Sequence, residues 1–155
     1  MKRKKLVCFI KFICVLLALL SLGSCDSEKS AEEILFSITQ AQDSLPNGTV
    51  YIRSAPEGSQ NYLSGSMIKT LYHESAEEYE FSLIEDFAIY LSSFAKPCEI
   101  AVYKCYSRSD TDLIASMCLK RIEKLRVMLA NTAFSQIPQN SKIDIKGRFV
   151  IVTML

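Results

Sequence analysis

The side chains best suited to acid–base or nucleophilic chemistry are few and scattered in this chain of 155 residues. His73 is the only histidine, so a multi-histidine metal centre is excluded and a serine–histidine–acid triad would depend on this one imidazole. Glu85 and Asp86 are adjacent on a predicted extended segment, where neighbouring side chains point to opposite faces. Glu99 alternates with the apolar Ile100 and is expected to be exposed. We therefore expect no catalytic residue, no cofactor and no metal site.

Three cysteines, Cys98, Cys105 and Cys118, lie in the region expected to fold. Cys98 and Cys105 fall on one predicted strand, too distant from each other to pair and on opposite faces. Cys118 lies on the following predicted helix, from which it could approach the sheet. Because no CxxC motif occurs, buried free thiols are the favoured interpretation. A single disulfide, and a redox or metal role, stay open.

Cys25 follows a basic segment, an apolar segment and a pair of small residues, in that order. Residues 2–5 are all basic, residues 12–22 are apolar or small, and Leu22-Gly23-Ser24 precede the cysteine. This order resembles the lipobox of bacterial lipoproteins. The resemblance implies that Cys25 receives a diacylglycerol group and becomes the first residue after cleavage. The uninterrupted apolar run is shorter than the ~20 residues that span a bilayer.

Two other fates of this segment stay open. A cut after Gly23 would release an ordinary secreted protein, and retention as an uncleaved helix would place Lys11 in or near the bilayer core, which is unfavourable. As a lipoprotein, the chain divides into a signal peptide (1–24), a polar tether from the lipidated cysteine (25–30) and a single domain (31–155). The expected location is the extracytoplasmic face of the cell membrane, with the lipid as anchor.

Removal of the signal peptide would change the charge balance. The whole chain carries 18 basic and 17 acidic side chains, and five basic but no acidic ones lie in residues 1–24. The remaining 13 basic and 17 acidic side chains give a net charge of −4. A mildly acidic domain argues against nucleic acid as a partner, and against docking on anionic lipid by charge alone.

Hydrophobic periodicity predicts a helix, an irregular segment, two strands, a long helix and two strands. The expected helices cover 31–42 and a long stretch from a Ser109 N-cap to about Asn131, and the expected strands cover 87–94, 98–106, 142–145 and 148–154. Whether residues 49–53 form a short strand, and whether residues 67–72 are helical or irregular, stays open. Lys146-Gly147 is expected to turn the last hairpin. The fold class is α+β: a two-layer arrangement of a roughly four-stranded, mainly antiparallel sheet covered by one long helix, plus a short N-terminal helix.

The long helix carries an apolar stripe that predicts core packing. Its members are Ile114, Met117, Cys118, Ile122, Leu125, Met128 and Leu129. Basic residues gather in its second half, among them Arg121, and they suit the negative carboxyl end of the helix dipole.

Several segments occur in an order that resembles a known family. They are Leu71-Tyr72, the acidic run at 73–80, the segment EIAVYK at 99–104, the long charged helix and GRFV at 147–150. Together with the signal segment, residues 66–155 resemble a family of small, uncharacterised lipoproteins from Firmicutes whose domain has no known function. The resemblance implies a cell-surface lipoprotein and supplies no catalytic residues.

The sequence therefore predicts a non-enzymatic, surface-anchored lipoprotein that acts as a binding or accessory domain on the outer face of a Gram-positive membrane. Its expected partners are the membrane, through the lipid, and an envelope protein or a wall polymer. The alternative is a cell-envelope hydrolase that uses carboxylates such as Glu85 or Glu99, which would need two carboxyl groups facing one cleft.

Overall fold

The computed structural model describes residues 29–72, 78–93 and 96–155. Cys25 and the predicted signal segment lie outside these residues, as do positions 73–77 of the acidic run. Within the described ranges, no helix combines the length and the apolar character needed to cross a membrane.

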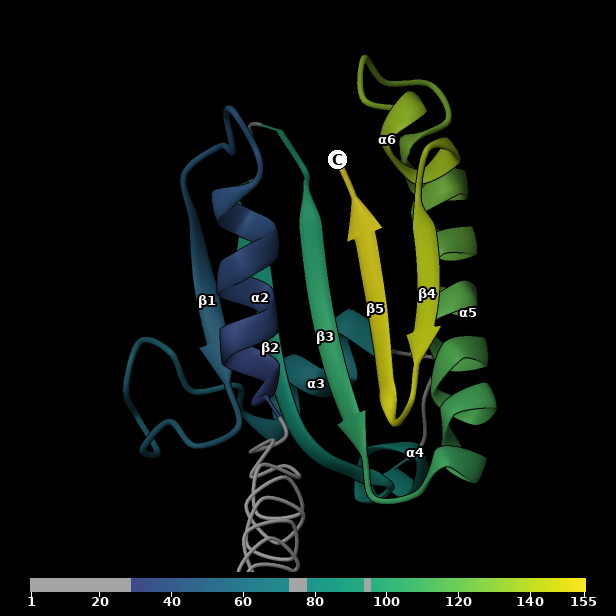
Figure 1. The fold of residues 1–155 in the computed structure, drawn as a ribbon. Coiled ribbons are helices and arrows are strands. Elements are labelled where there is room, and N and C mark those ends of the chain that lie inside the picture. Colours follow the sequence, from purple (N-terminus) through teal and green to yellow (C-terminus); the bar gives the residue numbers. More distant parts are fainter. Residues whose placement is uncertain (1–28, 73–77, 94–95) are drawn as a thin grey trace, which may run out of the picture.

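Five antiparallel strands form one sheet (Figure 1). They are β1 (Gly48–Ile52), β2 (Ile84–Ser92), β3 (Glu99–Cys105), β4 (Lys142–Lys146) and β5 (Phe149–Met154), in the spatial order β1-β2-β3-β5-β4. The two expected hairpins, β2–β3 and β4–β5, are both present. The predicted α+β class is confirmed, and the sheet has five strands instead of roughly four because β1 pairs with β2.

Helices cover both faces of this sheet. They are α2 (Ala31–Gln40), α3 (Gly65–Tyr72), α4 (Glu78–Ser82), α5 (Thr111–Leu129) and α6 (Gln136–Gln139), with a short 3-10 helix (Arg108–Asp110) leading into α5. Figure 1 shows α2 lying across β2 and β3, on the side opposite to α3 and α5. The short N-terminal helix thus adds a third layer to the two that the sequence predicts.

The face under α2 is a compact apolar layer. Its fully buried side chains include Ala31 and Leu35 of the helix and Ala88, Ile100 and Val102 of the sheet. Because Ile100 and Val102 alternate with residues that face α5, both faces of β3 are covered.

The amino terminus of α2 is fixed in two ways. Ser30 and Glu33 form a capping box, and the Asp86 carboxylate accepts a hydrogen bond from the backbone N–H of Ala31 at 2.9 Å. The expectation that Glu85 and Asp86 point to opposite faces is wrong, because the register shifts between Ile84 and Asp86. This bulge leaves Glu85 beside Lys104, which alternates onto the α2 face.

The face under α5 holds the larger core. Its buried side chains from the strands are Ile84, Phe87, Ile89, Ala101, Tyr103, Cys105, Val150, Val152 and Met154, and those from α5 are Ile114, Met117, Cys118 and Ile122. The stripe predicted for the long helix is thus confirmed over its first three turns. Met128 is 63% exposed, so the prediction of core packing is wrong for this residue. In the same last turns of α5, Leu125 and Leu129 border the pocket described below.

Two boundaries differ by a few residues from those predicted. Ser107, not Ser109, caps the start of the helical segment, in a capping box with Asp110. Lys146 pairs with Phe149, so the turn consists of Gly147 and Arg148, and Gly147 has the positive φ of 62° that favours glycine. Both apolar cores are built between Ala31 and Leu155. A chain that begins at residue 25 therefore retains all of their side chains.

Candidate functional site

A half-open pocket of about 550 Å³ lies at the end of the sheet where β2 ends and β3 begins. The start of β1, the second half of α5 and the short helix α6 complete its walls. Because α5 packs on β4 and β5, the end of β2 and the start of β1 keep an uncovered apolar surface beside it. The walls are mostly apolar, with Leu91, Leu125, Leu129 and Met154 among them.

An ion pair forms one polar part of the pocket wall, which also includes Asn47, Thr49, Ser92 and Ser93. The Nε of Arg121 lies 2.8 and 3.1 Å from the two carboxylate oxygens of Glu99, and its Nη2 lies 2.6 Å from one of them. Its Nη1 donates to the carbonyl oxygen of Leu71 at 2.6 Å. Only 11% of the Arg121 side chain and 6% of the Glu99 side chain are exposed. A two-point contact of this kind fixes both the position and the plane of the guanidinium group.

Two buried tyrosines support the ion pair from behind. The guanidinium carbon of Arg121 lies 5.2 Å from the centre of the Tyr72 ring, within the range of a cation–π contact. The hydroxyl groups of Tyr72 and Tyr103 form a hydrogen bond with each other. Among the buried side chains that the structure describes, every nitrogen and oxygen atom has a partner.

The protonation states follow from this burial. Burial raises the pKa of Tyr72 and of Tyr103 well above the ordinary value, so both hydroxyls stay neutral. Burial alone would lower the pKa of Arg121, but the charge and hydrogen bonds of Glu99 outweigh it and raise this pKa above its usual range. The site is thus a buried salt bridge on a neutral, hydrogen-bonded support.

Comparison of the chain with protein-family models, with curated proteins and with solved structures finds no match. The resemblance to the Firmicutes lipoproteins and the lipidation of Cys25 therefore stay predictions.

The structure corrects two expectations about this site. Glu99 does lie on the face opposite to Ile100, but it is buried because α5 covers that face. Arg121 is not explained by the helix dipole, because its guanidinium group binds Glu99 and the Leu71 carbonyl instead of the end of its own helix. No sequence motif marks this pair, since its members lie 22 positions apart and on different elements.

The two carboxylates proposed for a hydrolase lie at opposite ends of β3. Glu99 begins that strand, whereas Glu85 lies beside Lys104, five residues further along. At 3.3–3.4 Å per residue this separation is about 17 Å. Each carboxylate is also already bound to basic side chains. The geometry therefore does not bring these two groups into one cleft.

All three described cysteines are buried and free. Cys98 and Cys105 both lie in the core under α5, so the prediction that they face opposite sides of the sheet is wrong. The reason is that Cys98 lies one residue before β3, where the alternation of a regular strand does not apply. Burial raises the pKa of Cys98 and Cys118, and raises that of Cys105 to about 11. Such thiols are poor nucleophiles at neutral pH. In the described part of the chain, no group of three or more potential ligands could hold a metal ion.

Proposed function

We propose that this chain is a lipid-anchored binding domain on the outer face of a Gram-positive cell membrane, and that its pocket binds a small apolar molecule. The observation that carries the proposal is the pocket of about 550 Å³. Small-molecule sites are typically hollows of ~300–1,000 Å³ with apolar walls and a few fixed polar groups. Here the polar groups include the buried salt bridge of Arg121 and Glu99.

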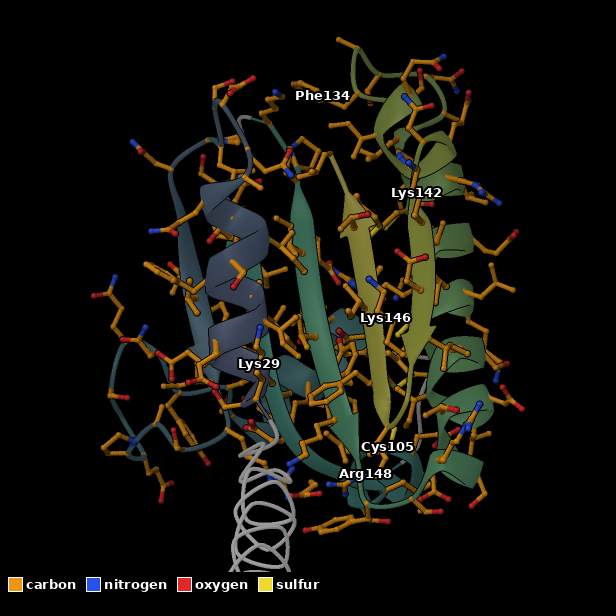
Figure 2. All side chains as sticks on the ribbon, in the orientation of Figure 1. Lys29, Cys105, Phe134, Lys142, Lys146 and Arg148 are labelled. Atoms are coloured by element: carbon orange, nitrogen blue, oxygen red, sulfur yellow. The ribbon has the colours of Figure 1, made fainter. Side chains whose placement is uncertain are left out.

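The position of the pocket suits an anchor at Cys25. A lipidated Cys25 would lie six residues before Ala31, so the bilayer surface would be within about 22 Å of the start of α2. Lys29 and Phe134 mark the lower end of α2 and the region of α6 in Figure 2, and the pocket lies toward α6. The pocket thus lies toward the end of the domain that is remote from the start of α2, where a membrane anchor would leave it accessible to molecules outside the cell.

The anchor is tested by intact-mass spectrometry of the full chain expressed in a Gram-positive host. We expect a membrane-bound species that begins at Cys25 and carries the mass of a diacylglycerol group. The Cys25→Ala variant should lack this species. An unmodified wild-type protein in the medium would contradict the anchor.

Ligand binding is tested on a soluble form, residues 25–155 with Cys25→Ser, which keeps both cores. The probe is Prodan, an uncharged naphthalene ketone whose fluorescence rises in apolar surroundings. We expect saturable binding that is weakened at least about tenfold by Leu129→Trp, because the larger side chain fills the pocket.

The matched control is Leu119→Trp on the same helix. Leu119 is 48% exposed and does not line the pocket, so this variant should bind Prodan like the parent protein. Absence of saturable binding, or equal affinity in the parent and both variants, would overturn the proposed binding function.

A further inference from the structure

The pocket has a definite preference for the charge of its ligand. We propose that it selects uncharged, largely apolar molecules that carry one hydrogen-bond acceptor, such as an amide or ketone carbonyl, and that it rejects both anions and cations. This inference rests on the proposed binding function and adds the chemical class of the ligand.

Two N–H donors of Arg121 make no hydrogen bond to the described residues. A guanidinium group has five N–H donors. Among the interactions of the described residues, Glu99 receives the Nε donor and one from Nη2, and Leu71 receives one from Nη1. One N–H on each terminal nitrogen is left. Because Arg121 is part of the pocket wall, a ligand acceptor in the pocket can bind these donors without displacing Glu99.

The salt bridge removes the charge preference that a lone arginine would have. The Glu99 carboxylate touches the guanidinium group at 2.6 Å, so a ligand charge near the pair is attracted by one partner and repelled by the other. The attraction and repulsion largely cancel, and the cost of moving the ligand charge out of water remains. A neutral acceptor does not incur that cost and still gains a hydrogen bond from a charged donor.

The guanidinium group is also held ready for such a ligand. The two-point contact with Glu99, the bond to the Leu71 carbonyl and the stacking on the Tyr72 ring each restrict its movement. Because these contacts exist without a ligand, binding has little side-chain entropy to lose at this position.

The apolar side chains of the wall set the apolar part of the ligand. Leu91 of β2, Leu125 and Leu129 of α5 and Met154 of β5 line the space beside the ion pair. An alkyl chain or an aromatic ring in this space would exchange water for apolar side chains, which favours binding. The fitting ligand is therefore an amphiphile with a small, neutral head.

The test uses three molecules with the same ten-carbon chain and different heads. Decanamide is neutral, decanoate is an anion and decylammonium is a cation near neutral pH. Each is used below its aggregation concentration to displace Prodan from the soluble form. We expect decanamide to compete at least about tenfold more strongly than either ion.

Each other outcome has a definite meaning. Stronger or equal competition by decanoate would make Arg121 the centre of an anion site, and the same result with decylammonium would make Glu99 the centre of a cation site. Either result overturns this inference but leaves the binding function standing. If Prodan itself does not bind, or binds outside the pocket by the Leu129→Trp criterion, both proposals fail.

A second measurement checks the contact itself without a variant that could unfold. In nitrogen-15 spectra, the side-chain N–H signals of Arg121 are recognised by their proximity to the Tyr72 ring. Decanamide should shift these signals, whereas those of the exposed Arg108, which precedes the same helix and does not line the pocket, should not respond. Unchanged Arg121 signals with decanamide bound would overturn the assignment of the acceptor to this residue.

Discussion

The two ends of β3 each hold a glutamate–arginine pair in a different environment. At the first residue of the strand, Glu99 binds Arg121, and 6% and 11% of their side chains are exposed. At the other end, Glu85 binds Arg148 and Lys104, with 34% of Glu85 and 30% of Arg148 exposed. The pair types match, but only the first is enclosed.

The covering elements explain this difference. The first pair lies under α5 and borders the pocket, whereas the second lies beside the β4–β5 turn. In a buried ion pair nearly all hydrogen bonds must be satisfied within the protein, because an unpaired charge there cannot be hydrated. In an exposed ion pair, water can hydrate either charge. The same type of ion pair therefore forms part of the pocket wall at one end of β3 and lies in partial contact with solvent at the other.

The difference in burial between the two ion pairs predicts the largest loss of stability for Arg121→Ala. This change leaves the Glu99 carboxylate buried without a partner and removes the donor to the Leu71 carbonyl. We expect a loss of about 3–5 kcal/mol in the free energy of unfolding, measured by urea denaturation. The matched change at the exposed end, Arg148→Ala, should cost about 1 kcal/mol or less, because Lys104 still faces Glu85.

Removal of both buried charges sharpens this prediction. The double variant Glu99→Leu/Arg121→Met has no unpaired charge and should be more stable than Arg121→Ala alone. Equal losses for Arg121→Ala and Arg148→Ala would show that burial does not distinguish the two ends.

The tyrosines behind the pocket should give the next largest effect. Tyr72→Phe leaves the Tyr103 hydroxyl buried without its partner, so we expect a loss of about 1–3 kcal/mol in the free energy of unfolding. On the α2 face, Tyr90→Phe removes a half-buried hydrogen bond to the Pro46 carbonyl, and the expected loss is about 1 kcal/mol. Thermal denaturation with parallel urea titrations would measure both.

A double-mutant cycle separates the hydrogen bond from packing. The variant Tyr72→Phe/Tyr103→Phe removes both hydroxyls, so its loss should be smaller than the sum of the two single losses. Strict additivity would mean that the two hydroxyls do not depend on each other, and would remove the tyrosine pair from the support of Arg121.

Local patterns predict most of this fold. Alternation identifies β2 and β3, the turn with Gly147 identifies the last hairpin, and the apolar stripe identifies the buried side of α5. The pattern does not reveal how many faces of the sheet are covered. The alternation of Glu99 with Ile100 predicts an exposed face at Glu99, yet Ala101 and Tyr103 on that same face are buried.

The candidate site depends on information that one sequence does not carry. Glu99 and Arg121 are polar residues in ordinary helix and strand patterns, and only the crossing of α5 over the sheet brings them together. The Glu85 bulge shifts the alternation by one position, because Ile84 and Phe87 face the same core although they are three residues apart. A single shift of this kind is a weak signal in one sequence. A basic residue on a long helix and an acidic residue at a strand end remain a weak signal for such a pair.

The smallest predicted effect is the pH dependence of the exposed pair. The hydrogen bond from Lys104, with further help from Arg148, holds the pKa of Glu85 below its ordinary value of 4.5. Since the folded-state pKa is the lower one, the stabilisation is complete above the unfolded-state value and is lost as the pH falls through the folded-state value. We expect wild type to exceed Glu85→Gln in stability at pH ~6 by less than about 1 kcal/mol, because the pair is exposed.

Urea denaturation of both proteins from pH ~6 to pH ~3 would measure this difference. It should shrink steadily once the pH falls below about 4.5, and added salt should reduce it at the upper end of the range. The buried pair offers the contrast, because its contacts are shielded from solvent and should respond far less to salt. A difference that stays constant across this range, or one that grows as the pH falls, would show that Glu85 is not held ionised by Lys104 and Arg148.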